Sequence, residues 1–495
     1  MNRLMMAGAA QQIPLHGHLG MREDRIGPWR GRLSSRRAFL ERLAYTSLAA
    51  SVFSSRALPL AGQQQYVQPA QEMAPAALPP PSTLTPEDDR FLNDLEQAAF
   101  LFFYEETNPD TGLTKDRCNV RTKDTSTAAS IASTGFGLTA LCIALKRGFI
   151  RYPEARLRVV RALSFIWHKL PTHRGFFFHF ADINTGERVF ESEVSSVDTA
   201  ILLCGVLTCR QSFQDHDIVQ LAHAIFDRVD WTWIAEDTSL LSMGWTPEMG
   251  FISTRWSMYS ELMMMYLLGM GSSSHPLDKA AWFAWKRSYF EYDGLRYIGA
   301  FAPLFVHQYS QAWFDFRGKR DQYADYFRNS TIATAAHRIF CLELHSEFPD
   351  YTNDLWGITA SDSKNGYVTW GGPPAMGPID GTVVPCAAGG SIPFLPADTM
   401  RVLHNIHDHY PNAWSRYGFV DAFNPLKGWY DTDVIGIDTG ITMLMAENAR
   451  TGYVWEEFMK NPEAQRGMEI AGFTRYTPTP PSPGAAQENV KPGPR

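Results

Sequence analysis

Three apolar segments of similar sequence recur about sixty residues apart, and this recurrence limits the possible folds more than any other feature. Each segment begins with Ser and is then apolar on nearly every face, which is the pattern of a helix buried on all sides. Amphipathic stretches at 153–169 and 215–230 separate them. The segments are Ser133–Leu145, Ser195–Leu207 and Ser257–Gly269.

Alternating buried and amphipathic helices predict an all-α fold in which inner and outer helices form an (α/α)6 barrel with long rim loops. Weaker members of the buried series lie at 298–312, 381–393 and 437–449. The loops before the inner helices would meet at one rim and form a cleft there. The Thr/Val/Gly-rich region 356–385 could be a small β subdomain, but we expect long loops with short hairpins.

The folded domain is expected over residues 85–475. Thr85-Pro86-Glu87-Asp88 has the pattern of a capping box with Pro in the first turn, so a helix should begin there and run to about Tyr104. Residues 57–84 are a linker rich in Pro, Ala and Gln, and 476–495 are a Pro-rich tail expected to be disordered.

The N-terminal residues 1–56 resemble a twin-arginine export signal. Ser35–Leu40 reads Ser-Arg-Arg-Ala-Phe-Leu, and a mildly apolar stretch follows. The alternative is a basic tail, and the true start is either Met1 or Met21. We therefore expect a periplasmic or secreted protein. After removal of the signal we expect no membrane partner, because no later stretch is long and apolar enough to span a bilayer.

Charge and motifs exclude several functions. The net charge is −7 and no long basic run lies outside the extreme N-terminus, which argues against nucleic acid. There is no phosphate loop, nucleophile elbow or dinucleotide fingerprint, so we expect no cofactor. The chain is 13% aromatic with 14 Trp, which suits either sugar stacking or a large core. We expect a monomer.

Glu261 is the first candidate for catalysis. It precedes Leu-Met-Met-Met-Tyr-Leu-Leu, and burial should let it hold a proton to high pH, as a glycosidase general acid must. The alternative is a first-turn Glu favoured by the helix dipole. Asp438 lies in a similar apolar setting, Val434–Ile441, and is either a helix cap or the group that activates water.

Other acids and aromatic residues could bind sugar. Asp198 belongs to a Ser-x-x-Asp pattern, so a capping role is an equal alternative. His404, His407 and His409 lack the Glu of a zinc hydrolase motif, so we expect no metal. The further rim acids are Glu191, Glu193, Asp380, Asp431, Asp433 and Glu447, and the aromatic candidates are Trp245, Trp256, Tyr259, Trp313, Tyr367, Trp370, Trp429 and Tyr430.

Several long motifs, in order, resemble the bacterial glucoamylase-like domain family over about residues 90–460. They are His307–Gly318, Trp356–Asp362, Asp380–Pro385, Tyr417–Asn424 and Glu447–Gly452. The resemblance implies an (α/α)6 barrel without metal, related to endo-β-1,2-glucanases and to the cyclisation domain of cyclic β-1,2-glucan synthases. The first motif adds His307, Gln308, Trp313, Asp315 and Arg317 as candidate substrate-binding residues.

The resemblance also implies catalytic roles. The general acid of the glucanases is a Glu in a Tyr-x-Glu setting, which matches Tyr259-Ser260-Glu261. Their base is an Asp near the C-terminal end that acts through a substrate hydroxyl; Asp438 is the best match, and Asp431 and Asp433 are rivals. In the retaining, cyclising relatives an upstream acid attacks directly, and Glu191, Glu193 or Asp198 would take that role.

This chain departs from the family pattern at Ser272–Ser274, at Gln311 and at Cys386. These departures leave the linkage and the preferred chain length open. Three functions remain: an exported endo-β-1,2-glucanase, a retaining transglycosylase or hydrolase of another linkage on the same fold, and a glycan-binding protein without catalysis. The retention of both Glu261 and Asp438 argues against the third.

Overall fold

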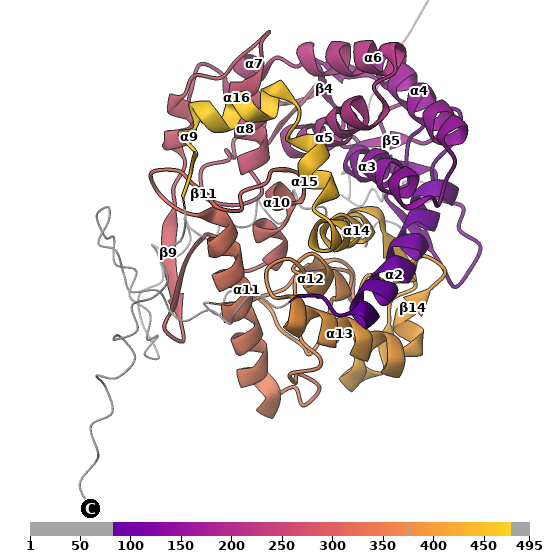
Figure 1. Cartoon of the computed structure of the whole chain (residues 1–495), viewed down its shortest axis with the longest axis vertical. Coiled ribbons are helices and arrows are strands. Elements are labelled where there is room, and N and C mark those ends of the chain that lie inside the picture. Colours follow the sequence, from indigo (N-terminus) through magenta and orange to yellow (C-terminus); the bar gives the residue numbers. More distant parts are fainter. Residues whose placement is uncertain (1–82, 374–376, 477–495) are drawn as a thin grey trace, which may run out of the picture.

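A computed structural model describes residues 83–373 and 377–476. The predicted export signal and nearly all of the predicted linker lie outside these residues, as does the tail from residue 477. The described chain is mainly helical (Figure 1). Its α-helices are α2 (Pro86–Glu105), α3 (Ile131–Arg147), α4 (Tyr152–His168), α5 (Ser196–Phe213), α6 (His216–Asp227), α7 (Trp231–Ala235), α8 (Met263–Gly271), α9 (Ala280–Ala284), α10 (Tyr309–Trp313), α11 (Tyr326–Glu343), α12 (Pro385–Gly389), α13 (Pro396–His409), α14 (Gly436–Arg450), α15 (Tyr453–Phe458) and α16 (Pro462–Ile470).

Short antiparallel strands connect the helices, and the prediction of an all-α fold included such strands only between residues 356 and 385. The pairs are β1 (Arg117–Asn119) with β18 (Asp433–Ile435), β2 (Ala128–Ser130) with β5 (Phe180–Asp182), β3 (Thr172–His173) with β4 (Phe176–Phe177), β9 (Ser288–Tyr292) with β10 (Leu295–Gly299), β11 (Lys319–Arg320) with β19 (Thr474–Arg475), β12 (Ala360–Ser361) with β13 (Val368–Thr369), β14 (Trp414–Ser415) with β15 (Gly418–Phe419), and β16 (Phe423–Asn424) with β17 (Trp429–Tyr430). A further three-stranded sheet joins β6 (Val194–Ser195), β7 (Gly244–Thr246) and β8 (Gly250–Phe251).

The capping box predicted at the start of α2 is confirmed. The Thr85 hydroxyl accepts a hydrogen bond from the Asp88 amide at 3.1 Å, and the Asp88 carboxylate accepts one from the Thr85 amide at 2.8 Å. Long loops with short hairpins were predicted between residues 356 and 385, and where the structure describes this region it has long loops and one hairpin, β12–β13.

Six helices follow one another around the centre of the molecule: α3, α5, α8, α10, α12 and α14 (Figure 1). Packing joins α14 to α3, α3 to α5, α5 to α8, and α12 to α14. Hydrogen bonds connect α10 to its two neighbours. The Ser310 hydroxyl on α10 donates to the Glu261 carbonyl before α8, and the Gln308 side chain before α10 donates to the Ala387 carbonyl on α12. Helices α2, α4, α6, α11 and α13 lie outside this ring, and α16 packs on α8.

Helices α3 and α5 approach each other closely because glycines lie at their contact. A Cβ placed on Gly205 would lie 2.2 Å from the Gly135 carbonyl oxygen, and one placed on Gly135 would lie 2.4 Å from the Ile201 oxygen. Only glycine permits this spacing, which explains why both of these apolar helices contain glycine in their middle. None of the described helices is both long and apolar enough to cross a membrane.

Three of the six predicted inner helices are correct and three are shorter than predicted. Helices α3, α5 and α14 match their segments. The segment 257–269 is helical only from Met263, because the chain before it is held in an extended path: the Tyr259 amide bonds to the Lys286 carbonyl, and Met258 bridges Lys286. Residues 298–312 contain the end of β10, a 3-10 turn (Leu304–His307) and α10. In 381–393 only Pro385–Gly389 is helical.

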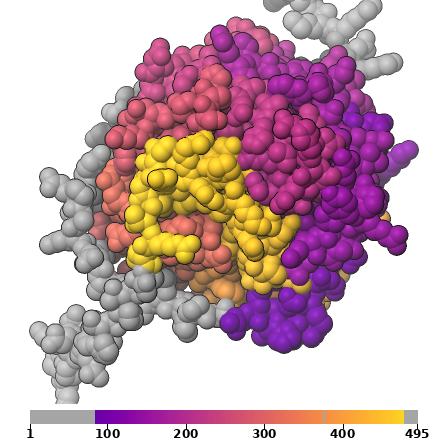
Figure 2. Space-filling model, turned by 45° about the horizontal axis from the view of Figure 1, so that its top comes forward, coloured from indigo at the N-terminus to yellow at the C-terminus, as the bar shows by residue number. Residues whose placement is uncertain are grey.

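The C-terminal segment closes the molecule. Figure 2 shows it, in yellow, lying across one face against earlier parts of the chain. Helix α16 packs on α8, and β19 pairs with β11. A buried ion pair fixes this segment: the Arg210 guanidinium at the C-terminal end of α5 lies against Glu463 and donates to the Asn461 side chain at 2.6 Å. The C-terminal helices are therefore an integral part of the core.

Candidate active site

The segments that lead into the inner helices are hydrogen-bonded to one another. Strand β18, before α14, pairs with β1, and Lys115 next to β1 bridges Ala129 of β2, before α3. Strand β2 pairs with β5, and Phe178 bridges Val194 of β6, before α5. Val383, before α12, bridges Phe423. The N-terminal ends of these helices therefore lie at one rim, and the rim carries most of the buried acids.

Glu261 lies at the start of α8, not within its first turn. Its side chain is 1% exposed, and it precedes Leu262, the residue that caps the helix. The Glu261 carbonyl accepts a hydrogen bond from the Ser310 hydroxyl at 2.8 Å, and that hydroxyl accepts one from the Met264 amide at 3.1 Å. Ser310 therefore fixes the backbone of Glu261. The predicted burial of Glu261 is confirmed, and burial favours the neutral form of a carboxyl group; its role as proton donor stays a prediction.

Asp438 lies in the first turn of α14 and is 8% exposed. The Cys386 thiol donates to its Oδ1 at 3.3 Å. It also neighbours Asp421, whose pKa is raised well above its ordinary value by burial and by the negative charge of Asp438. Both acids line a small hollow between α2, α12 and α14.

Asp438 and Asp421 belong to a larger group of buried carboxylates. Asp421 Oδ2 accepts a hydrogen bond from the Asp362 amide at 2.6 Å. Burial, together with the charge of Asp362, raises the pKa of Asp431 to about 8. Arg117 supplies positive charge, with Nη1 2.6 Å from Asp362 Oδ2 and 3.9 Å from Asp433 Oδ2. The negative charge of this group is therefore reduced in two ways: by the raised pKa of Asp431 and by the ion pair between Arg117 and Asp362.

Among the residues that the structure describes, two groups of possible metal ligands have spacings that could hold a cation. One oxygen each of Asp362, Asp421 and Asp431 lie within 4.8 Å of one another, and so do ligand atoms of Glu106, Cys118 and Asp124. In both groups a basic side chain already occupies the neighbourhood. Arg117 binds Asp362 in the first group, and Lys115 lies 2.7 Å from both Glu106 and Asp124 in the second. We assign no metal to either.

His179 links two predicted acids and was missed in the sequence. Its Nδ1 lies 3.4 Å from Glu193 Oε1 and its Nε2 3.6 Å from Asp198 Oδ2. Burial alone would lower the pKa of His179, but the charges of Asp198 and Glu193 outweigh it and raise the pKa to about 9. Asp198 also accepts a hydrogen bond from the Ser195 hydroxyl at 2.5 Å, and Ser195 caps α5 by accepting one from the Asp198 amide at 3.3 Å. His179 could have been noticed as the polar residue in the aromatic run Phe176–Phe180.

The charge on His179 predicts that stability falls between pH 6.5 and about 9. In the unfolded chain a His has a pKa near 6.5, whereas folded His179 holds its proton to about pH 9. Below pH 6.5 both states hold the proton and the stabilisation is complete; above it, each pH unit removes ~1.4 kcal/mol until the folded pKa is reached. Melting curves of the wild type and of His179→Gln measure this, and their difference should shrink as pH rises. A difference that does not change with pH would contradict the assignment.

Some predicted substrate-binding residues lie at the rim but are engaged in packing. Trp256 is buried and donates to the Ser196 hydroxyl at 2.8 Å. The Tyr259 hydroxyl lies 3.2 Å from His307 Nδ1, and burial lowers the pKa of His307 to about 3. Gln308 is buried and donates to Ala387 and Ser391. These four residues therefore pack beneath the rim and support its loops.

Asp380, Trp429 and Tyr430 lie on loops near the start of α12. Asp380 pairs with Lys427 and accepts a hydrogen bond from the Thr382 hydroxyl at 2.6 Å. Trp429 and Tyr430 form β17 and are half-buried, and the Tyr430 ring lies parallel to Phe423 with centroids 5.6 Å apart. All three remain candidates for contact with a substrate.

Four predicted substrate-binding residues lie at the opposite end of the inner helices, away from the acids of the rim. Glu447 is in the last turn of α14, where it binds Arg147 and the Thr451 hydroxyl. Trp313 ends α10 and is fully buried. Asp315 and Arg317 follow it and pair with each other at 2.9 Å. We leave these four out of the candidate site.

The three histidines of α13 also have structural contacts. His404 bonds to Asp88 at 3.0 Å, His407 to Asp408 at 2.8 Å, and His409 to the Asn405 carbonyl at 3.3 Å.

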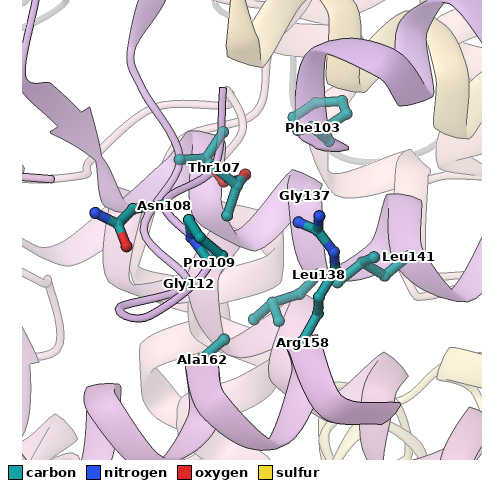
Figure 3. Close-up of a pocket in the computed structure, with 11 residues that line it drawn as sticks. Phe103, Thr107, Asn108, Pro109, Gly112, Gly137, Leu138, Leu141, Arg158 and Ala162 are labelled. Atoms are coloured by element: carbon teal, nitrogen blue, oxygen red, sulfur yellow. Dashed lines mark hydrogen bonds between the residues drawn. The ribbon is translucent and has the colours of Figure 1, made fainter. Parts of the chain in front are cut away.

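A second hollow, between α2, α3 and α4, is shown in Figure 3. Arg158 is the only charged residue among those that line it, so it offers no acid or base pair for catalysis.

Comparison with known proteins shows the relationships of the chain. Residues 253–462 match the Glycoamylase family model, described as "Putative glucoamylase". A curated relative, the exo β-1,2-glucooligosaccharide sophorohydrolase (non-reducing end) of Parabacteroides distasonis, is 28% identical over 422 residues, which are 77% of this chain. The chain spans 58% of the length of that relative.

The chain is also similar to solved structures, and it covers a larger share of some of them than of the curated relative. The endo-β-1,2-glucanase of Chitinophaga pinensis has a TM-score of 0.74 at 26% identity, covering 78% of this chain and 98% of that one. The β-1,2-glucanase of Parabacteroides distasonis has a TM-score of 0.72 at 26% identity, covering 78% and 60%. The endo-β-1,2-glucanase of Talaromyces funiculosus, with a TM-score of 0.57 and 11% identity over 77% and 87%, shares the fold. These matches, together with the sequence motifs, show that this chain is similar to glucoamylase-like proteins and to β-1,2-glucanases over most of its described length.

Proposed function

We propose that this protein is a glycoside hydrolase that cleaves β-1,2-glucan, with Glu261 as general acid and Asp438 as the base that activates water. The observation that carries the proposal is the rim, where buried Glu261 and Asp438 stand at the starts of two inner helices. The similarity to the Chitinophaga pinensis glucanase, which extends over 98% of that chain, supports the substrate class.

We also propose how the helices form the binding site. The six inner helices form an (α/α)6 barrel, and the glucan binds in the cleft formed by the loops at their N-terminal ends. In this position the sugar lies against acids that are already shielded from water, and charge developing in the transition state is stabilised more strongly there than in solution. No metal or cofactor takes part, because proton transfer between two carboxyl groups and water is sufficient for the reaction.

Two patterns of cleavage are possible on this fold. Endo cleavage agrees with the Chitinophaga pinensis enzyme, and exo cleavage that releases the disaccharide sophorose agrees with the Parabacteroides distasonis relative. Incubating the purified protein with linear β-1,2-glucan, β-1,3-glucan and soluble starch tests both. A ladder of oligosaccharides from the β-1,2 polymer indicates endo cleavage, and sophorose alone indicates exo cleavage. No product from the β-1,2 polymer would reject the proposal.

We also propose that the protein is exported through the twin-arginine route and acts in the periplasm or outside the cell, as a monomer. The motif Ser35–Leu40 supports this, and a polymeric glucan outside the cytoplasm is a consistent substrate. Fractionation of cells that carry the wild type or the double variant Arg36→Lys/Arg37→Lys tests the route. Export of the variant at the wild-type level would refute it.

A further inference from the structure

An aromatic ring is exposed at the rim, on the loop between β5 and β6. Phe190 is 48% exposed, whereas Phe176, Phe177 and Phe180 in the preceding segment are buried. The Phe190 ring meets Phe180 edge to face, with centroids 5.8 Å apart. Phe180 in turn stacks on His179 at 3.9 Å. Two ring contacts therefore connect Phe190 to the histidine that binds Glu193 and Asp198.

The backbone of this loop is held in a costly conformation. Phe190 has a φ of 59° and Glu191 a φ of 51°, which is the left-handed region that residues with a Cβ avoid. Such strain persists only where the surroundings impose it, and it is concentrated at functional sites. A Gly at position 190 would adopt this conformation without strain, so the aromatic side chain is present despite its cost to the backbone.

Arg188 imposes the conformation. Its guanidinium donates to the Ser192 carbonyl at 2.5 Å and to the Glu191 carbonyl at 2.6 Å, and so fixes the backbone on the C-terminal side of Phe190. It also binds Glu248 at 2.6 Å. Glu248 lies in the turn between β7 and β8, so the loop is tied to the neighbouring hairpin. The exposed ring is thus fixed in place before any ligand arrives, which lowers the entropy cost of binding.

The surroundings of the ring have the chemistry of a sugar-binding surface. Met249, at the tip of the β7–β8 turn, is 74% exposed and adds a second apolar group. The charged side chains of Arg188, Glu191 and Glu248 accompany these two apolar groups on the same pair of loops. A pyranose ring has an apolar face and a periphery of hydroxyl groups, so it can stack on an aromatic ring while it bonds to charged neighbours.

We propose that Phe190 is a stacking platform for a glucosyl unit of the substrate, at the entrance to the cleft and away from the bond that is cleaved. This inference rests on the proposed function, and it adds a residue that determines how strongly longer chains bind. A single exposed ring with a few charged neighbours is too small a surface for a protein partner, whereas it matches one sugar unit. The contacts through Phe180 and His179 place the platform next to the acids of the rim.

Steady-state kinetics on β-1,2-glucan oligosaccharides of increasing length tests the platform in the full-length protein. Phe190→Ala is expected to raise KM about five- to tenfold for the longer chains, the effect of losing one aromatic stacking contact, while kcat changes less than KM. Phe190→Trp should keep KM close to the wild-type value, because a Trp also offers a flat ring. Phe283→Ala is the matched control: it is the same truncation of an exposed Phe, which lies on α9 near Tyr323.

The outcomes separate the two proposals. If the wild type cleaves β-1,2-glucan and Phe190→Ala has the same KM as the wild type, the platform is rejected and the proposed function stands. The platform is also rejected if Phe283→Ala raises KM to the same extent, or if Phe190→Trp is as defective as Phe190→Ala. If the wild type cleaves no β-1,2-glucan, the proposed function is rejected and the platform with it. A rise in KM specific to Phe190→Ala and restored in Phe190→Trp supports the platform.

Discussion

Glu261→Gln is expected to lower kcat on β-1,2-glucan by about a hundred- to ten-thousandfold while the protein stays folded. The amide has the shape of the carboxyl group, so it fits a side chain that is 1% exposed. It cannot, however, give a proton to the leaving oxygen, and the leaving group of a glucan is poor without one. The measurement is kcat with a β-1,2-glucan oligosaccharide, together with calorimetric binding of the same oligosaccharide, which the variant should retain.

Glu96→Gln is the matched control for this variant. Glu96 is also a buried Glu, with an exposed fraction of 0%, but it lies on α2 and binds Arg450 at the last turn of α14. Burial raises the pKa of Glu96 to about 8, so near neutral pH Gln replaces a mostly neutral carboxyl group; the melting temperature should change little, and kcat should stay within about twofold of the wild type. If Glu261→Gln kept more than about a tenth of the wild-type kcat, Glu261 would not be the general acid.

The long inner helices could be predicted because each is apolar on every side. A run such as Ser195–Leu207 has no solvent face and can only be a buried element, and α5 follows it closely. The same reasoning overestimated the helix in Ser257–Gly269, since its first residues are bound to Lys286 and are not helical. That pairing partner is almost thirty residues away, and nothing in the local pattern indicates it.

The candidate site was predictable only where a residue stands out from its own neighbours. Glu261 and Asp438 could be found as acids within apolar runs. Asp362 and Asp421 end or lie within motifs that the sequence shows, but their approach to each other depends on the meeting of two distant loops. Glu447 was assigned to the rim although it lies nine residues after Asp438 on the same helix, which at 1.5 Å per residue is about 13 Å away. Helix geometry alone could have excluded it.

The carboxylates around α14 differ in their suitability as a base. A base must be ionised, and Asp431 is poorly suited because its pKa is raised to about 8. Asp433 is held by the Asn119 amide group at 3.1 Å and lies near Arg117, which indicates a structural role. Asp421 is buried beside Asp438, and the charge of Asp438 raises its pKa. A raised pKa makes Asp421 a poorer candidate for an ionised base, which leaves Asp438 as the preferred one.

Asp438→Asn is accordingly expected to lower kcat by about a hundredfold or more, since the water is then no longer activated. The position of Asp438 in the first turn of α14 favours its ionised form through the helix dipole, and the Cys386 thiol donates to it. Asp433→Asn is the matched comparison and should lower melting temperature more than kcat. Proton NMR of the first product, which shows whether the anomeric configuration is inverted, completes the measurement. The assignment of Asp438 would be wrong if the configuration were retained and if Asp438→Asn kept its activity while Asp198→Asn or Glu193→Gln lost it. The second catalytic residue would then be one of the acids around His179. It would act as a nucleophile, which must lie on the side of the sugar opposite to the leaving group.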